Sequence, residues 1–329
     1  METNKTLIVG CGINYAFNNA FKAINSFYRS NFSYTEILPQ MFKDPKNTSD
    51  LKSKFQNYLN NHNNLNLEEF LRYGFADAIG SLCEKEREEI KNEFIKILGK
   101  NHRDVTFKLP LQDEDFQPFK ENLKAFNRIY TTNFDLKLYY LMAKPELKLF
   151  DSFKDGFCEK LKCEDFDIHL FKARSTPWSL VYLHGSMHLL SYPEADFDAL
   201  KIAKAQSGNL IEKREKLCSS GKFHDLFVLG GTTEEKLDII ENNSYLKNAL
   251  ESLKNIEGDL IIYGCSIDDN DAHIWQNICN SRIKNIYIGI SSDKDIDRIK
   301  NHFKNKNIAF YCQDDNNIWK VVDWLNKVT

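Results

Sequence analysis

Residues Asn127 to Leu141 read NRIYTTNFDLKLYYL, and this stretch decides the fold. The pattern predicts a short strand at Arg128–Tyr130, a polar turn at Thr131–Asn133 and then an amphipathic helix. The helix would carry its apolar side chains on one side, at Phe134, Leu138 and Leu141. Because ligands of open α/β sheets bind beyond the carboxyl ends of the strands, this turn is a candidate binding site.

The same turn also has a purely structural interpretation. Thr132 or Asn133 would be the N-cap of the helix, and the helix dipole would stabilise Asp135 in the first turn. Considered alone, the turn favours capping over a ligand site. Patterns elsewhere in the chain are needed to distinguish the two interpretations.

A second strand–turn–helix unit begins the chain. Thr6–Val9 is a β-branched and apolar strand, and a helical pattern covers residues 16–27. The turn between them contains Gly10, Gly12 and Asn14. A Gly-x-Gly turn at this place lets a pyrophosphate approach backbone N–H groups. Tyr15 occupies the third glycine position of the dinucleotide fingerprint, so a tight turn without a ligand is an equal alternative.

Residues 31–125 have a different pattern, which predicts a helical insert. Apolar residues recur there at helical spacing, opposite charged faces that we expect to be solvated. The stretches concerned are 50–59, 67–82 and 85–98. Gly99 would end the last helix. The α/β domain then comprises residues 1–30 and 126–329.

The middle of the chain contains a buried-strand pattern at Leu180–Leu183, which ends in His184 and Gly185. A histidine at a strand end lies where open α/β sheets place their chemistry. A structural histidine bonded to a neighbouring backbone group is the alternative. His188 falls in a stretch with little pattern, and residues 195–217 are predicted to be helical and peripheral.

Strands alternate with helices through the last third of the chain. The predicted strands are 226–229, 259–263, 286–290 and 308–311, after two earlier ones at 147–150 and 168–171. The predicted helices are 234–253, 272–279, 296–303 and 318–325. This alternation predicts an α/β fold with a doubly wound, parallel, Rossmann-like sheet.

Composition excludes several classes of protein. Of the 329 residues, 42% are hydrophobic, which supplies a full core and excludes global disorder. The net charge of -3 gives no strong nucleic-acid signal. No stretch resembles a signal peptide or a membrane span, and the eight cysteines form no disulfide framework. We therefore expect a cytoplasmic protein without membrane contact. Cys158 and Cys163 lack a second pair, so we expect loop cysteines and no zinc site.

Four distinctive turns follow predicted strands, and in a parallel sheet they can share one edge. They read GCGIN from Gly10, TTNFD from Thr131, LHG from Leu183 and GCS from Gly264. In this order they resemble the sirtuin fold, whose comparable turns bind NAD. The closing segment, IIYGCSIDDNDAHI at 261–274, is still more similar to the sirtuin-like proteins of bacterial anti-phage defence. The resemblance covers residues 4–30 and 126–329.

The resemblance implies roles for individual residues. Asn133 would hold the ribose or the attacking water, and His184 would be the general base. Asp135 would orient Asn133 and favour positive charge on the ribose, or cap its helix. The implied NAD-binding residues are Gly10, Gly12, Asn14, Thr132, Gly264, Ser266 and Asp271. For Asp271, bracing of its turn is the favoured role.

Two departures from the sirtuin pattern matter. The paired Cys-x-x-Cys motifs of the zinc module are absent, so we predict no metal site, and protein deacylation is disfavoured. Asn14 stands where the resemblance has serine. Members of the sirtuin-like group that lack the zinc module are implied to hydrolyse NAD to nicotinamide and ADP-ribose. NAD would then be the substrate, with no prosthetic group.

These observations predict an NAD glycohydrolase that depletes NAD as an effector of anti-phage defence. A regulatory protein partner, a phage-derived trigger or assembly into a homo-oligomer would have to control it, and the helical insert is the expected place for that control. The alternatives are a nucleotide sensor without turnover, an NAD-dependent deacylase and an ADP-ribosyltransferase. A dehydrogenase is least favoured, because the third glycine and a hydride-transfer site are both missing.

Overall fold

The computed structural model describes residues 4–15, 32–43, 50–61, 66–73, 82–102, 123–143, 154–162, 166–172, 178–192, 199–205 and 210–312. The predicted helices 16–27 and 318–325, the predicted strand 147–150 and Cys163 lie outside these residues.

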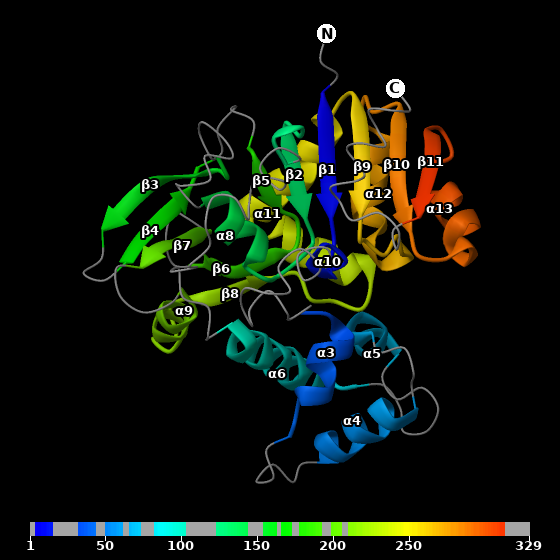
Figure 1. Cartoon of the computed structure of the whole chain (residues 1–329). Helices are drawn as coiled ribbons and strands as arrows, with labels where there is room; N and C mark the ends of the chain where they lie inside the picture. The colour runs from blue at the N-terminus through cyan, green and yellow to red at the C-terminus, as the bar shows by residue number, and fades with distance from the viewer. Residues whose placement is uncertain are drawn as a thin grey trace.

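A six-stranded parallel sheet lies beside an antiparallel sheet (Figure 1). The strands of the parallel sheet, in spatial order, are β11 (Asn307–Cys312), β10 (Asn285–Ile290), β9 (Asp259–Tyr263), β1 (Lys5–Val9), β2 (Arg128–Thr131) and β5 (Leu180–Tyr182). Every residue of β9 is buried, as expected for a central strand with both faces covered. The predicted α/β fold with a parallel sheet is confirmed. The strand order reverses between β1 and β9, which is the arrangement that creates a ligand crevice in doubly wound sheets.

A second, antiparallel sheet was not predicted. Its strands, in spatial order, are β3 (Phe157–Lys162), β4 (Phe166–Phe171), β7 (Leu200–Ala205), β6 (Gly185–Ser191) and β8 (His224–Phe227). The assignment of residues 226–229 to the parallel sheet is wrong, because β8 pairs with β6 in the antiparallel direction. A short apolar strand has the same pattern in either kind of sheet, so the sequence did not distinguish them.

Three further expectations for this region are wrong. His188 lies in the middle of β6 and is fully buried, although its surroundings had little pattern. Residues 195–217 are not wholly helical, since β7 precedes helix α9 (Leu210–Cys218). Cys158 lies at an exposed position of β3 and not in a loop.

The described part of residues 31–125 is helical up to the approach to β2, and its helices lie beyond the arrowheads of β1 and β2 in Figure 1. The elements are α3 (Tyr34–Ile37), η1 (Leu38–Gln40), α4 (Asp50–Asn61), α5 (Leu67–Tyr73) and α6 (Glu84–His102). The prediction that Gly99 ends a helix is wrong, because α6 continues to His102. A Cβ at Gly99 would lie 3.4 Å from Met187 and 3.5 Å from Ile211, so this glycine packs closely inside a helix.

The remaining elements follow the strands. They are α8 (Lys137–Ala143), α10 (Thr233–Glu241), α11 (Ser244–Ser252), η3 (Leu253–Asn255), η4 (Asp269–Asp271), α12 (Ala272–Cys279), η5 (Asp293–Asp295) and α13 (Ile296–His302). The single helix predicted at 234–253 is wrong, because Asn243 interrupts it. The Asn243 side chain accepts the backbone N–H of Leu246 at 3.1 Å and starts α11 as its N-cap. None of the described helices is long and apolar enough to cross a bilayer.

Candidate functional site

A pocket of about 190 Å³ lies beyond the carboxyl ends of the parallel strands, where the strand order reverses. Eight of the residues singled out in the sequence line it: Gly10, Thr132, Asn133, Asp135, His184, Gly264, Ser266 and Asp271. The helices of residues 34–102, which we call the helical segment, close the opposite side of the pocket with Tyr34, Glu68, Phe94 and Leu98. Turns that are far apart in the sequence therefore meet at one crevice, together with the helical segment.

The glycine turns after β1 and β9 pack directly against each other. A Cβ on Gly10 would lie 2.4 Å from the carbonyl oxygen of Gly264. Gly264 has a φ of +66°, and a Cβ there would lie 2.5 Å from Cα of Gly12. The N–H of Gly12 donates to Gly264 at 3.0 Å, so these glycines are explained by the close approach of two turns.

The N–H groups of this first turn are already used within the protein. Those of Ile13, Asn14 and Tyr15 donate to carbonyl groups three residues earlier, at 3.0 to 3.2 Å. A pyrophosphate bound at this turn would therefore have to replace these bonds. These N–H groups are among the donors on which the predicted anion site depends, and they are engaged within the protein.

Gly12 and Asn14 do not line the pocket, and Asn14 has a different contact from the predicted one. Its side chain is fully buried, and Nδ2 donates to Oδ2 of Asp135 at 2.9 Å. The other oxygen of Asp135 accepts the backbone N–H of Lys137 at 2.9 Å, at the start of α8. Asp135 thus accepts the N–H of the first residue of α8, and the helix begins too late for Thr132 or Asn133 to be its N-cap. Asp135 also lines the pocket, so a helix-start contact and a ligand site are compatible at this turn.

Backbone contacts hold the turn after β2 in place. Oγ1 of Thr131 accepts the N–H of Asn133 at 3.0 Å. The carbonyl oxygen of Phe134 accepts two donors from β6, the hydroxyl of Ser186 and the N–H of Met187, both at 3.0 Å. The antiparallel sheet therefore fixes the loop that presents Asn133 and Asp135.

His184 lies where the chain leaves the parallel sheet after β5 and enters the antiparallel sheet as β6. Gly185 makes this transition possible, because its φ is +78° and a Cβ there would lie 1.8 Å from the carbonyl oxygen of Leu226. The carbonyl oxygen of His184 accepts the N–H of Val228 at 2.9 Å. The backbone that carries the imidazole is consequently fixed, and the His184 side chain is almost completely buried.

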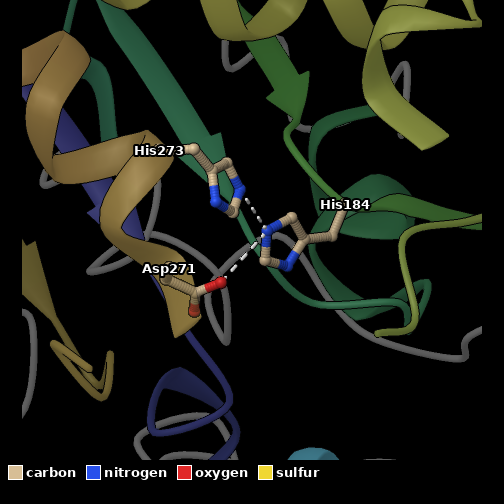
Figure 2. A group of neighbouring side chains, drawn as sticks. All are labelled: His184, Asp271 and His273. Carbon is tan, nitrogen blue, oxygen red and sulfur yellow. Dashed lines mark hydrogen bonds and ion pairs between the residues drawn. The ribbon is translucent and has the colours of Figure 1, made fainter. Parts of the chain in front are cut away.

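Figure 2 shows the side chains that meet at His184. Nε2 of His184 lies 3.3 Å from Nε2 of His273 and 3.5 Å from Oδ1 of Asp271. His273 lies in the first turn of α12 and is buried, and its Nδ1 has no hydrogen-bond partner among the described residues. The three side chains come from two different chain segments and converge on one point.

Burial dominates the titration of the two histidines. It lowers the pKa of His184 to about 3, with Asp271 raising it and Lys236 and His273 lowering it. Burial also lowers the pKa of His273 to about 4. Both rings are therefore neutral near pH 7, and each retains a nitrogen lone pair that can accept a proton.

A buried ammonium group neutralises Asp271. Nζ of Lys236 lies 2.6 Å from Oδ1 of Asp271 and 2.8 Å from Oε2 of Glu68. The ligand atoms of His184, Asp271 and His273 lie within 4.8 Å of one another, which is close enough to surround a metal ion. Because Lys236 already occupies the carboxylate oxygen, we interpret the cluster as a hydrogen-bonded network.

Ser266, the last of the predicted residues, lies at the rim. Its hydroxyl bonds to Asp268, and Asp268 forms an ion pair with Arg298. The indole Nε1 of Trp275 donates to the carbonyl oxygen of Asp268 at 3.2 Å. This side of the pocket is thus a braced polar turn.

The chain matches a family described as a domain of unknown function, DUF4917, over residues 21–321. The chain belongs to the DUF4917 family. No curated protein matches it. Membership of DUF4917 does not indicate an activity, so the function has to be argued from the pocket.

The sequence interpretation gave no role to three residues of this hydrogen-bonded network, which are His273, Lys236 and Glu68. His273 was part of the quoted segment 261–274, and its spacing of two from Asp271 was the available signal. Lys236 and Glu68 were given no role, because a lysine and a glutamate on predicted helices are normally solvated. Only the three-dimensional contact between α5 and α10 brings Lys236 against Glu68, which lines the pocket.

Proposed function

We propose that the protein is an NAD glycohydrolase, which cleaves NAD to nicotinamide and ADP-ribose. One observation carries the proposal: Asn133, Asp135 and His184 line a single pocket at the point where the order of the parallel strands reverses. Doubly wound sheets bind nucleotides at that point. The resemblance of the four turns to sirtuin-like proteins supplies the reaction.

The reaction needs little from the protein before the bond breaks. The C1′–N bond gives its electron pair to the pyridinium nitrogen, which becomes neutral nicotinamide, and positive charge develops on the ribose. The carboxylate of Asp135 is a suitable group to stabilise this charge. Water then bonds to C1′ and loses one proton.

His184 would accept that proton. The carboxylate of Asp271, 3.5 Å from Nε2, favours the tautomer with hydrogen on Nε2 and leaves Nδ1 as the basic nitrogen. A base with a pKa of about 3 is weak. It suits a reaction in which the bond to nicotinamide breaks before water attacks, because water adding to a cation loses its proton readily.

The dimensions of the pocket suggest how NAD would bind. Pockets for drug-sized ligands measure about 300 to 1,000 Å³, whereas this one has about 190 Å³. The polar groups that would act on the ribose lie inside it. We therefore expect it to hold the nicotinamide riboside end of NAD, with the remaining part at the mouth.

The biological role that we propose is that of a cytoplasmic effector in anti-phage defence, which depletes NAD when activated. Its support is the resemblance of residues 261–274 to sirtuin-like defence proteins. A regulatory protein partner, a phage-derived trigger or homo-oligomer formation would control the activity. Expression in a phage-infected host should reduce NAD and plaque number for the wild type but not for His184→Ala. Equal plaque numbers would argue against this role.

An NAD cleavage assay tests the activity itself. Wild-type protein should release nicotinamide, whereas Asn133→Ala and His184→Ala should release about 100-fold less or none. Wild-type activity in both variants would contradict the assigned catalytic pair. Binding of NAD without release would support the alternative of a nucleotide sensor. Transfer to an acyl-lysine peptide or to protein would support a deacylase or an ADP-ribosyltransferase.

A further inference from the structure

A chain of buried charged groups connects the helical segment to His184. Lys236 of α10 has no exposed surface, and its ammonium group contacts Glu68 of α5 on one side and Asp271 on the other. Asp271 in turn lies beside His184. Glu68 also accepts hydrogen bonds from Tyr34 and Asn270. The order Glu68, Lys236, Asp271, His184 therefore runs from the helical segment to the candidate base.

The beginning of α10 is in contact with the helical segment at two neighbouring points as well. Arg87 of α6 forms an ion pair with Glu235, the residue before Lys236. Gly231 packs on the backbone of α5, where a Cβ would lie 2.5 Å from the nitrogen of Arg72. Gly231, Glu235 and Lys236 thus form a docking surface for α5 and α6, and these contacts hold Lys236 in place.

Lys236 does not line the pocket, so it cannot act by touching a ligand there. Its effect has to pass through its two carboxylate partners. Removing a buried ammonium group leaves two carboxylates without their counter-charge, and buried unpaired charges are strongly unfavourable. The carboxylates would then rearrange or take up a proton, and Asp271 would no longer be held against His184.

We propose that Lys236 is a positioning residue, and that docking of the helical segment on Gly231, Glu235 and Lys236 holds Asp271 where it orients His184 for proton transfer. This inference deepens the proposed NAD hydrolysis and rests on it. It gives the helical segment a defined way to control the site. A partner that displaces α5 from α10 would disengage Asp271 from His184.

Three variants test the inference. Lys236→Met removes the ammonium group, Lys236→Arg retains a charge, and Gly231→Ala pushes α5 away without altering any charged side chain. Lys247→Met is the matched control, because Lys247 forms an exposed ion pair with Glu241 at 2.8 Å. Steady-state NAD cleavage across a pH series separates kcat from KM for each protein.

We expect Lys236→Met and Gly231→Ala to lower kcat about tenfold or more. KM should change less than kcat in Lys236→Met, because Lys236 does not line the pocket. Lys236→Arg should retain part of the activity, and Lys247→Met should match the wild type. Asp271 raises the pKa of His184 more than Lys236 lowers it, so the release of Asp271 in Lys236→Met should move the acidic limb of the profile to lower pH. An unchanged kcat and pH profile in Lys236→Met would overturn the inference. If that variant does not fold, unchanged kinetics in Gly231→Ala would overturn it.

A second measurement separates this inference from the proposed function. Histidine-selective ¹⁵N NMR reports the tautomer and titration of His184 without turnover, with His184→Gln providing the assignment. Absence of NAD cleavage by the wild type would refute the hydrolase. The spectra would still test the coupling, because an identical His184 titration in wild type and in Gly231→Ala would refute the role of docking.

Discussion

Nε2 of His102 lies 3.2 Å from the backbone nitrogen of Leu136, so the last residue of α6 is attached to the loop that carries Asn133 and Asp135. Nδ1 of the same ring lies 2.7 Å from the carbonyl oxygen of Leu98. Because the carbonyl group only accepts and the Leu136 N–H only donates, Nδ1 carries the hydrogen and Nε2 accepts. The contact therefore requires a neutral imidazole.

This contact predicts acid sensitivity. Burial lowers the pKa of His102 to about 4 from 6.5, against an opposing effect of Asp135. The contribution of neutral His102 to folding stability is complete above the unfolded-state pKa. It is lost as the pH falls toward 4, because in this range only the unfolded chain takes up the proton. Between the unfolded-state pKa and pH 5 the free energy of unfolding falls by about 2 kcal/mol. Urea unfolding at about pH 7.5 and about pH 5 should show a smaller acid-induced loss for His102→Gln than for the wild type. Equal losses would contradict the neutral contact.

Gly185 provides a prediction for folding stability. Its positive φ and the 1.8 Å approach of a Cβ to the Leu226 carbonyl oxygen mean that Gly185→Ala is strained in two ways. Gly221 is the matched control, since its φ is +74° but nothing lies within 4 Å of a Cβ there. We expect Gly221→Ala to cost about 1 kcal/mol and Gly185→Ala at least about 3 kcal/mol in the free energy of unfolding. Similar costs, measured by urea denaturation, would show that the β5–β6 transition tolerates a side chain.

Local sequence patterns predicted the parallel strands and the residues at their ends. Buried strands such as β9 have a continuous apolar pattern, and the turns that follow them contain glycine or small polar residues. Asn133, His184 and Gly264 each follow a predicted parallel strand. Since all parallel strands end at the same edge, their common location could be predicted. This is why eight predicted residues line one pocket.

The remaining features depend on long-range contacts that leave little local pattern. The antiparallel sheet brings together strands from residues 157 to 227, and the apolar pattern of β8 does not specify its partner. The break at Asn243 is a single capping residue within a helical pattern. Lys236 resembles a surface lysine until α5 covers it. Residues whose environment is made by a distant segment could not be identified from their neighbours.

Asp271→Asn tests the residue next to the candidate base. The amide retains the shape of the carboxylate but removes the charge that favours hydrogen on Nε2 of His184 and stabilises the ring when it is protonated. We expect kcat for NAD cleavage to fall about 10- to 100-fold. Asp269→Asn is the control, because Asp269 is an exposed neighbour whose side chain contacts His302 at 3.2 Å. Equal losses in the two variants would indicate a general effect on the η4 turn.

Asn14→Ala distinguishes the contact in the structure from the one that the sirtuin resemblance implied. In the structure Nδ2 of Asn14 donates to the buried carboxylate of Asp135, so the variant should lose about 1.5 to 3 kcal/mol of stability, as expected for a bond to a charged group. Asp135 would then be less well fixed in the pocket, which should reduce kcat more than it changes KM. If Asn14 instead held a phosphate or ribose of NAD, the variant would raise KM and leave kcat nearly intact. Steady-state kinetics together with thermal unfolding of the same preparation separates these outcomes, because only the structural contact couples a loss of stability to a loss of kcat.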